Sequence, residues 1–316
     1  MMRPSRKASA IAALVCACLL LGGCVERAFA GPSRTGSPRA GSARAPHPLA
    51  RAYLVRGILG LIFSRGMNRL AEKLGEAGID AKVHDFPQCD EIADTAISEY
   101  GEAPAPIVLI GHSMGGRCVL LMARRLQEAK IPVGLLVTVD PVHGSPSVPA
   151  NVERYINIFL SDSLLGGGDV MAEQGFQGHF ASFDLASHWD VSHISIDKLD
   201  ALHDQLIAKC VELATTPAKA EGEAIPLRYV VPPDAPVELW DSGIAVSARA
   251  GDTLQTLAAT HRVPIWSITQ VNPGLEGQPL IVGERVILPR HLLAMSAVSR
   301  QTRVRNEKAN GVASKR

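Results

Sequence analysis

Positive charge is scarce in the part of the chain where a nucleic-acid-binding domain would need it. The 316 residues include 32 Lys and Arg and 31 Asp and Glu. Residues 52–290 hold 18 Lys and Arg against 29 Asp and Glu, whereas the flanks 31–51 and 291–316 are basic. Binding to nucleic acid requires a basic face that displaces the counterions of the phosphates. The sequence therefore excludes nucleic acid as a partner of the central part and predicts a solvated basic tail over 291–316.

Long hydrophobic runs are also lacking, because the apolar run at residues 11–21 is too short to span a bilayer. Three basic residues precede it, as in a signal peptide. It ends in Leu-Gly-Gly-Cys at residues 21–24, which resembles the lipobox of bacterial lipoproteins. That resemblance implies a signal peptide over 1–23, acylation of Cys24 and an exported, lipid-anchored protein of the periplasm or cell envelope. Cleavage after Ala30 is the alternative and predicts a soluble secreted protein.

Cysteine is too sparse for a disulfide-rich fold. Residues 24–51 are predicted to be a flexible tether, since 31–50 are almost entirely small residues, Pro, Arg and His. Cysteines beyond the tether are limited to Cys89, Cys118 and Cys210. An exported chain with three cysteines forms at most one internal disulfide and keeps a free thiol, and the pairing is open. Their spacing matches no metal site, and we expect neither a metal nor a cofactor.

The composition, 47% hydrophobic and 20% charged, excludes a disordered or collagen-like chain. From residue 52, short apolar runs alternate with amphipathic stretches. This pattern predicts an α/β fold, in which helices cover both faces of a mostly parallel sheet. The expected segments are 53–55, 65–77, 81–86, 91–100, 107–110 and 116–129.

A serine between glycines follows the most apolar of these runs. Residues 107–110 read Ile-Val-Leu-Ile and lead into Gly-His-Ser-Met-Gly-Gly and then a helix. A strand, a sharp turn and a helix are the context in which G-x-S-x-G acts as a nucleophile elbow. Over residues 52–215 the sequence resembles the α/β-hydrolase superfamily, in particular its lipase-like and esterase-like members. The resemblance implies that Ser113 is a nucleophile, followed along the chain by an acid and a histidine.

The acid and the histidine are chosen by their places at the ends of strands and helices. Asp140 directly follows the apolar run 135–139, and open parallel sheets place their sites at such strand ends. Pancreatic-type lipases resemble this arrangement, and Asp162 is the rival acid. His193 precedes the last amphipathic stretch, where the superfamily has its histidine, and His188 is the rival base.

Two backbone N–H groups are expected to stabilise the oxyanion of an acyl-transfer reaction. The elbow provides that of Met114. The loop after the first strand resembles the His-Gly loop of lipases and implies the amide of Ile58 as the second donor. In this loop Arg56 stands in place of the histidine.

A second unit is predicted after a linker over 216–243. Residues 244–290 have a β-α-α-β pattern with Gly-Asp-Thr-Leu at 251–254 and Val-Ile-Leu-Pro at 286–289. This unit resembles a LysM domain, which implies binding of peptidoglycan or another N-acetylglucosamine glycan. The glycan-binding residues implied by the resemblance are Gly251, Asp252, Thr253, Leu254, Asn272, Pro273 and Ile281.

Together these features predict an envelope serine hydrolase that acts on carboxylic esters with a triad of Ser113, His193 and Asp140. Its LysM unit is expected to hold it on peptidoglycan, and an acylated Cys24 is expected to hold it on a membrane. The alternative hypothesis is a non-catalytic peptidoglycan-binding lipoprotein that uses the hydrolase fold as a scaffold.

Overall fold

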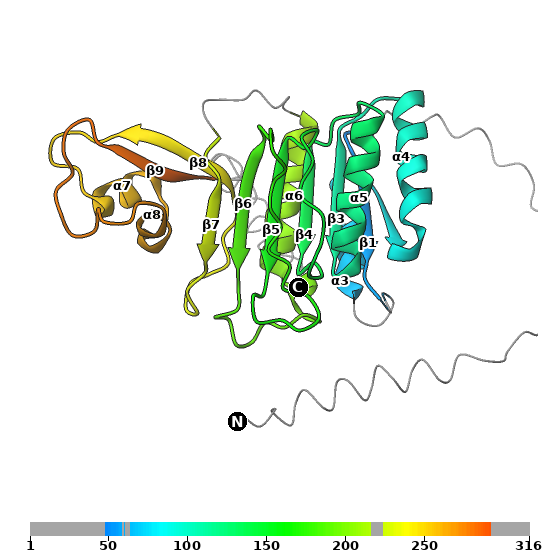
Figure 1. The fold of residues 1–316 in the computed structure, drawn as a ribbon, viewed down its shortest axis with the longest axis horizontal. Helices are drawn as coiled ribbons and strands as arrows, with labels where there is room; N and C mark the ends of the chain where they lie inside the picture. The colour runs from blue at the N-terminus through cyan, green and yellow to red at the C-terminus, as the bar shows by residue number, and fades with distance from the viewer. Residues whose placement is uncertain (1–47, 59, 61–63, 216–223, 292–316) are drawn as a thin grey trace, which may run out of the picture. The chain divides into compact units, whose positions relative to one another are not determined.

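The computed structural model describes residues 48–58, 60, 64–215 and 224–291 (Figure 1). The predicted signal peptide, Cys24 and most of the tether lie outside these residues, as does the basic tail beyond His291. No helix in the described ranges has the length and apolar character needed to cross a membrane. The helices and strands are, in chain order, β1 Arg51–Arg56, α3 Arg65–Glu76, β2 Asp80–Asp85, the 3₁₀ turn η1 Phe86–Gln88, α4 Cys89–Glu102, β3 Ile107–His112, α5 Met114–Glu128, β4 Leu135–Val139, β5 Arg154–Phe159, β6 His179–Asp184, the 3₁₀ turn η2 Ile196–Lys198, α6 Asp200–Thr215, β7 Leu227–Val230, β8 Trp240–Ser247, α7 Leu254–His261, α8 Ile265–Val271 and β9 Arg285–His291.

The larger sheet has seven strands in the order β2-β1-β3-β4-β5-β6-β7, and every neighbouring pair is parallel. This confirms the predicted mostly parallel α/β sheet. The chain leaves β1 toward β2 and returns to β3 on the other side of β1. Open parallel sheets hold their sites at such a reversal, beyond the carboxyl ends of the strands. The loops after β1 and β3 meet there.

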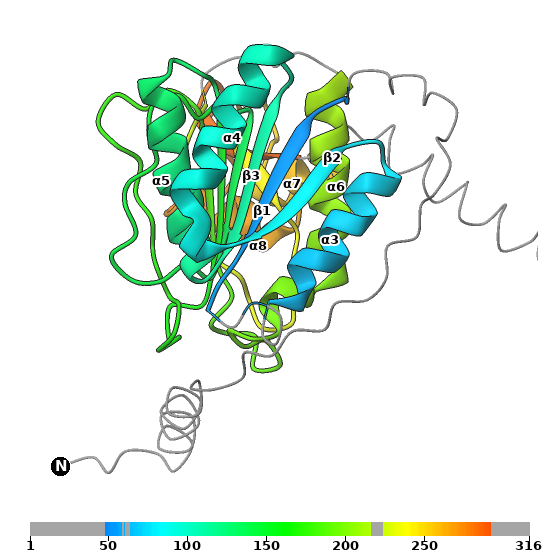
Figure 2. The same cartoon turned by 90° about the vertical axis from the view of Figure 1, so that its right-hand side faces the viewer.

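Helices cover both faces of this sheet (Figure 2). Helices α3 and α6 pack on one face, and α4 and α5 pack on the other. In α5 the buried residues Val119, Met122, Ala123 and Leu126 recur every three or four positions, which gives the helix one apolar side. Strand β3 lies between the two layers and is buried along all six residues, as its continuous apolar run predicts.

A disulfide joins Cys89, at the start of α4, to Cys118 in α5. It leaves Cys210 as a buried thiol in α6. The bond closes a loop with a sequence separation of 29, and a loop of this length contributes roughly 3–4 kcal/mol in the chain-entropy model. Because α5 follows the elbow serine, the bond also fixes the helix that carries the site.

The described part of the predicted linker 216–243 is not a linker. Residues 227–230 form β7, the last strand of the sheet, and β8 begins at Trp240. In β7 the buried Leu227 and Tyr229 alternate with two exposed residues. An alternation of only four residues, next to prolines, is too short to stand out in the sequence. The strand is paired with β6, which is distant in the sequence, so that local pattern does not reveal the pairing. The sheet domain therefore extends beyond residue 215.

The C-terminal unit has the order β8-α7-α8-β9, in which β8 and β9 form an antiparallel pair. This is the β-α-α-β order that the sequence predicts. Helix α7 begins with a capping box between Thr253 and Thr256. The unit has a small core of its own, which includes Leu254, Ile268, Val286 and Leu288.

Aromatic side chains form one part of the contact between the C-terminal unit and the sheet domain. Trp240 of β8 is fully buried, and the centroid of its ring lies 5.1 Å from that of Tyr229 in β7. Trp266 of α8 lies 5.4 Å from the same tyrosine ring. Nearby, the side chain of Gln270 accepts a hydrogen bond from Val230 N–H and donates one to Val230 O.

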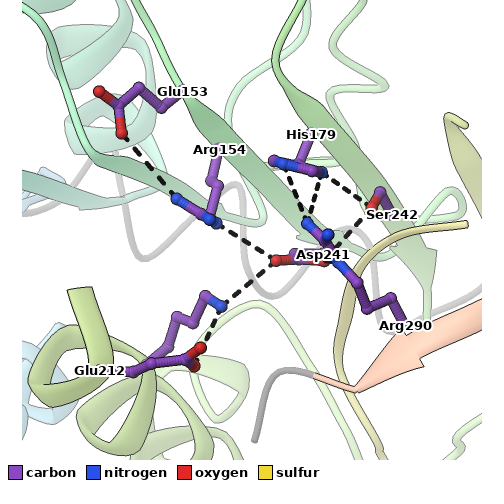
Figure 3. A network of polar contacts seen from close by, with 8 residues as sticks. Glu153, Arg154, His179, Glu212, Asp241, Ser242 and Arg290 are labelled. Atoms are coloured by element: carbon purple, nitrogen blue, oxygen red, sulfur yellow. Dashed lines mark hydrogen bonds and ion pairs between the residues drawn. The ribbon is translucent and has the colours of Figure 1, made fainter. Parts of the chain in front are cut away.

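Beside the aromatic residues, a group of charged side chains joins the same two parts (Figure 3). Asp241 of β8 is 1% exposed and lies within 3.3 Å of Arg154 Nε, Lys209 Nζ and Arg290 Nε. Arg290 Nη2 also contacts the ring of His179 at 2.9 Å from Nε2. Burial and the nearby cations lower the pKa of His179 to about 4. The ring is therefore neutral and accepts this hydrogen bond. We refer to Asp241, Arg154, Lys209, Arg290 and His179 as the Asp241 cluster.

Candidate active site

Ser113 occupies the turn between β3 and α5 with a backbone φ of 60° and ψ of −123°. A residue other than glycine is strained at this φ, and such strain is typical of functional turns. The turn is tight, because a Cβ on Gly111 would lie 2.2 Å from the carbonyl oxygen of Gly115. The two glycines of the G-x-S-x-G motif therefore let the strand and the helix meet around the serine.

The structure brings together the three side chains that the sequence singles out. His193 Nε2 lies 3.0 Å from Ser113 Oγ, and His193 Nδ1 lies 2.6 Å from Asp140 Oδ2. The carboxylate only accepts, so Nδ1 carries a proton, and a neutral ring then leaves Nε2 free to accept the proton of the serine. The three residues come from the loops that follow β3, β4 and β6.

Asp140 is held by a shell of backbone donors. It is fully buried, and its Oδ1 accepts hydrogen bonds from Leu160 N–H and Gly167 N–H at 3.1 and 2.8 Å. Burial alone raises the pKa of this carboxyl, but the hydrogen bonds from His193, Gly167 and Leu160 offset the burial and hold the pKa below its ordinary value. Asp140 is therefore a carboxylate at neutral pH.

The glycine run at residues 166–168 packs directly on this acid. A Cβ on Gly166 would lie 2.3 Å from Asp140 Cγ, and Gly168 N–H donates to Pro141 O. The sequence shows the run but not its contact. The two rival residues lie elsewhere, since Asp162 is exposed on the loop after β5. His188 is buried, and its Nε2 has no partner among the residues that the structure describes.

The loop after β1 runs against Ser113. A Cβ on Gly57 would lie 2.7 Å from Ser113 Cβ and 3.1 Å from Ser113 Oγ, so the next residue, Ile58, belongs to a backbone that borders the serine. Met114 opens α5, and the first amides of a helix lack acceptors within the helix. Both amides predicted as oxyanion donors therefore belong to segments next to Ser113.

Arg56, which the sequence places where the lipase loop has a histidine, bonds to side chains of β2 and α3. Its Nε and Nη2 donate to the two carboxylate oxygens of Asp85 at 3.0 and 2.9 Å. Its Nη1 lies 3.3 Å from Asn68 Oδ1. The side chain joins the ends of β1 and β2 and fixes the base of the loop.

His112 is the main site residue that the sequence analysis missed. It precedes the serine, is 1% exposed, and its ring centroid lies 4.9 Å from that of His193. Its Nε2 lies 2.9 Å from the carbonyl oxygen of His193, and its Nδ1 lies 2.7 Å from Ser64 Oγ. Burial and the neighbouring His193 lower the pKa of His112 to about 4. A histidine beside a nucleophile is a visible signal, but its partners come from distant segments.

A second buried carboxyl, Asp197, lies in η2, directly after the loop that carries His193. It is 2% exposed, and its Oδ2 accepts the N–H of Gly66 in the first turn of α3 at 2.9 Å. Its Oδ1 has no partner within the described part of the chain. Burial raises the pKa of Asp197 to about 6. The folded protein therefore keeps this proton to a higher pH than the unfolded chain does.

This difference gives a pH-dependent stability that Asp197→Asn is expected to remove. The contribution is fully present below about pH 4, where both states are protonated, and is lost as the pH rises through about 6. A shift of roughly two units corresponds to a loss of about 2–3 kcal/mol. Free energies of unfolding in urea at pH 4, 6 and 8 measure it. The variant should gain stability relative to wild type as the pH rises, while the exposed-site control Asp162→Asn should not; parallel curves would contradict the assignment.

The residues predicted to bind glycan divide into two sets. Gly251, Pro273 and Ile281 are exposed, and Asp252 and Thr253 are half-buried. Leu280 N–H donates to Asp252 O at 2.8 Å, so the loop after β8 lies beside the loop before β9. These five residues remain at the surface of the unit.

The side chains of the other two make contacts inside the unit. Leu254 is 1% exposed and belongs to the core. Asn272 Nδ2 donates to the carbonyl oxygens of Ile268 and Ile287, and its Oδ1 accepts from Ile287 N–H. The amide of Asn272 therefore joins α8 to β9.

Comparisons with known proteins yield similar solved structures only. No protein-family model matches the sequence, and no curated protein matches it. The esterase domain of a Rhodothermus marinus protein is 16% identical, with 53% of this chain and 88% of that one covered and a TM-score of 0.38. Human thioesterase 2 is 12% identical, with 54% and 100% covered and a TM-score of 0.35. A Xanthomonas campestris pv. campestris protein of the alpha/beta hydrolase superfamily is 15% identical, with 53% and 99% covered and a TM-score of 0.34. Because these TM-scores are low, the function of this chain is inferred from the order of its strands and from the contacts of Ser113, His193 and Asp140.

Proposed function

We propose that this protein is a serine hydrolase that cleaves carboxylic esters. The observation that carries the proposal is the chain of contacts from Ser113 Oγ through His193 to the buried Asp140. A serine hydroxyl is a weak nucleophile at neutral pH and needs a base whose tautomer is fixed by a third group. The hydrogen-bonding distances and the order of the three residues along the chain support these roles.

In the proposed mechanism, His193 Nε2 takes the proton of Ser113 as Oγ attacks the acyl carbonyl carbon. The backbone N–H groups of Met114 and Ile58 donate to the oxyanion that forms. His193 then gives its proton to the departing alkoxide, and an acyl ester on Ser113 remains. Water, deprotonated by His193, attacks this ester, and His193 returns that proton to Ser113 Oγ as the acid leaves. Asp140 holds the imidazole and stabilises its cationic form throughout.

Exposed apolar side chains on the loops that carry the site would suit an apolar acyl group. Large apolar side chains that stand next to the site loops are exposed: Ile58 at 57%, Leu165 at 47%, Trp189 at 91% and Ile194 at 45%. Ile58 follows Gly57, Leu165 precedes Gly166, and Ile194 follows His193. Burial of an acyl chain against such side chains contributes about 0.8 kcal/mol for each methylene.

Labelling with a fluorophosphonate tests the proposal directly. The reagent forms a covalent bond with an activated serine, and an inert hydroxyl does not react at a comparable rate. We expect one adduct, which peptide mass spectrometry places on Ser113. A protein that stays unlabelled, or that carries the adduct on another serine, would overturn the assignment.

We further propose that the C-terminal unit is a LysM module that binds peptidoglycan or a related N-acetylglucosamine glycan. The β-α-α-β order and the two adjacent loops with Gly251, Asp252, Thr253, Pro273 and Ile281 support this proposal. With an acylated Cys24, the module would hold the enzyme in the cell envelope. Co-sedimentation with purified peptidoglycan tests the binding, and a protein that stays in the supernatant would argue against it.

A further inference from the structure

Three segments of the proposed site meet at His112. They are the loop with Gly57, the start of α3 at Ser64 and the loop with His193. Gly57 N–H donates to Ser64 Oγ at 3.3 Å, Ser64 Oγ lies 2.7 Å from His112 Nδ1, and His112 Nε2 lies 2.9 Å from His193 O. Gly57, Ser64 and His112 are all buried.

The chemistry of the partners fixes the direction of each hydrogen bond. A carbonyl oxygen only accepts, so Nε2 of His112 carries a proton and donates to His193 O. In a neutral ring Nδ1 is then an acceptor, and the hydroxyl of Ser64 donates to it. The oxygen of that hydroxyl accepts from Gly57 N–H. These hydrogen bonds form a chain, called the run below, that has one consistent arrangement of protons. It leads from Gly57 N–H through Ser64 and His112 to His193 O.

The hydroxyl of Ser64 bonds to His112 and Gly57 and does not cap helix α3. Ser64 is the N-cap residue of α3, a position where serine commonly accepts a hydrogen bond from the first turn. It makes no such capping bond here. The carboxylate of Asp197 accepts from Gly66 N–H in the first turn instead. Asp197 therefore provides the capping hydrogen bond in the first turn of α3, and the Ser64 hydroxyl remains available for His112 and Gly57.

We propose that His112 and Ser64 are positioning residues that set the distance between the oxyanion loop and the base. His112 holds the backbone of His193, and Ser64 holds the backbone of Gly57 next to the predicted oxyanion donor Ile58. Neither side chain needs to touch the substrate. This inference rests on the proposed hydrolase function, since it assigns a role within the same site.

Two substitutions of His112 test its hydrogen bond to His193 and its hydrogen bond to Ser64 separately. In His112→Gln the amide nitrogen replaces Nε2 and keeps a donor for His193 O. In His112→Asn the amide oxygen replaces Nδ1 and keeps an acceptor for Ser64, but the contact with His193 is lost. We expect kcat to fall on the order of 10²-fold in His112→Asn and less than 10-fold in His112→Gln, with KM nearly unchanged, because small misplacements of a reacting group cost this much.

Ser64→Ala completes the test through a double-mutant cycle. We expect a loss of about 10-fold in kcat, and the loss in Ser64→Ala/His112→Asn should be smaller than the product of the single losses because the two act as one run. His188→Gln, at a buried histidine of the loop that carries His193, is the matched control and should keep its kcat. Independent, multiplicative effects, or equal losses in His112→Gln and His112→Asn, would contradict the proposal.

Proton NMR gives a readout that needs no turnover. The proton that His193 Nδ1 shares with Asp140 should give a far-downfield signal, which His112→Gln retains and His112→Asn broadens or loses. A retained signal in both variants would overturn the positioning role. If wild type neither reacts with fluorophosphonate nor cleaves esters, the proposed function fails, but the NMR comparison still decides whether His112 positions His193.

Discussion

Replacement of Ser113 by alanine is expected to lower ester turnover by on the order of 10⁶-fold. Removal of the nucleophile from a serine triad leaves only the catalysis that comes from the oxyanion donors and from substrate binding. The measurement is kcat on p-nitrophenyl esters from acetate to palmitate, with wild type and Ser113→Ala side by side. The profile over chain length also reports whether the exposed apolar residues at the site bind the acyl chain.

A matched pair of carboxyl variants tests the rest of the triad in the same assay. Asp140→Asn should lower kcat by about 10⁴-fold, because an amide no longer fixes the tautomer of His193. Asp162→Asn removes an exposed carboxyl from a neighbouring loop and should leave kcat unchanged. An enzyme that depends on Asp162 instead would contradict the geometry. If no ester is turned over by wild type, the alternative of a non-catalytic scaffold gains support.

The sequence predicts the parts of the fold that depend on local pattern. The buried strand before Ser113 and the run that ends at Asp140 are continuous apolar segments, and the elbow lies where one of them meets a helix. His193 is placed in sequence by the amphipathic stretch that follows it. Each of these inferences uses residues of a single strand, turn or helix, and the structure shows that the three side chains meet.

The sequence fails where a feature depends on contacts between distant segments. Cys89 has two possible partners among the cysteines that follow the tether, and only the packing of α4 on α5 selects Cys118. The role of Gly166 is visible only from its approach to Asp140. The three hydrogen bonds that Asn272 makes inside the unit likewise join segments that the sequence pattern does not pair.

The position of the C-terminal unit is the largest difference between prediction and structure. A flexible linker would let this unit be removed without consequence for the sheet domain. Instead, Trp266 packs on Tyr229, and Arg290 lies against His179 and Asp241. A chain ending at residue 243 would lose both contacts. Loss of ester hydrolysis after such a truncation would therefore say nothing about glycan binding.

Substitution within the Asp241 cluster tests how tightly the C-terminal unit and the sheet domain are joined. Asp241 is the buried carboxylate at its centre, in contact with three cations whose side chains are 8%, 3% and 22% exposed. Glu153 and Glu212 lie at its outer edge and are 45% and 40% exposed. Burial raises the pKa of Asp241, but Lys209 and Arg290 offset this effect and hold the pKa below its ordinary value. The charge of Asp241 therefore persists at neutral pH and, together with Glu153 and Glu212, offsets the positive charge of the three cations.

Asp241→Ala is expected to lower the free energy of unfolding by about 3–5 kcal/mol, because it leaves buried cations without their carboxylate. Denaturant unfolding at neutral pH measures the loss, and Asp234→Ala, at an exposed site just before β8, is the control that should change little. In wild type, tryptophan fluorescence and far-UV circular dichroism should show one coincident transition, since Trp240 and Trp266 lie where the two parts meet. Separate transitions, or an unchanged stability in Asp241→Ala, would mean that the C-terminal unit folds independently. A single transition that Asp241→Ala lowers as a whole would mean that the proposed glycan-binding loops and Ser113 belong to one folded body, so that binding to the wall would fix where the nucleophile acts.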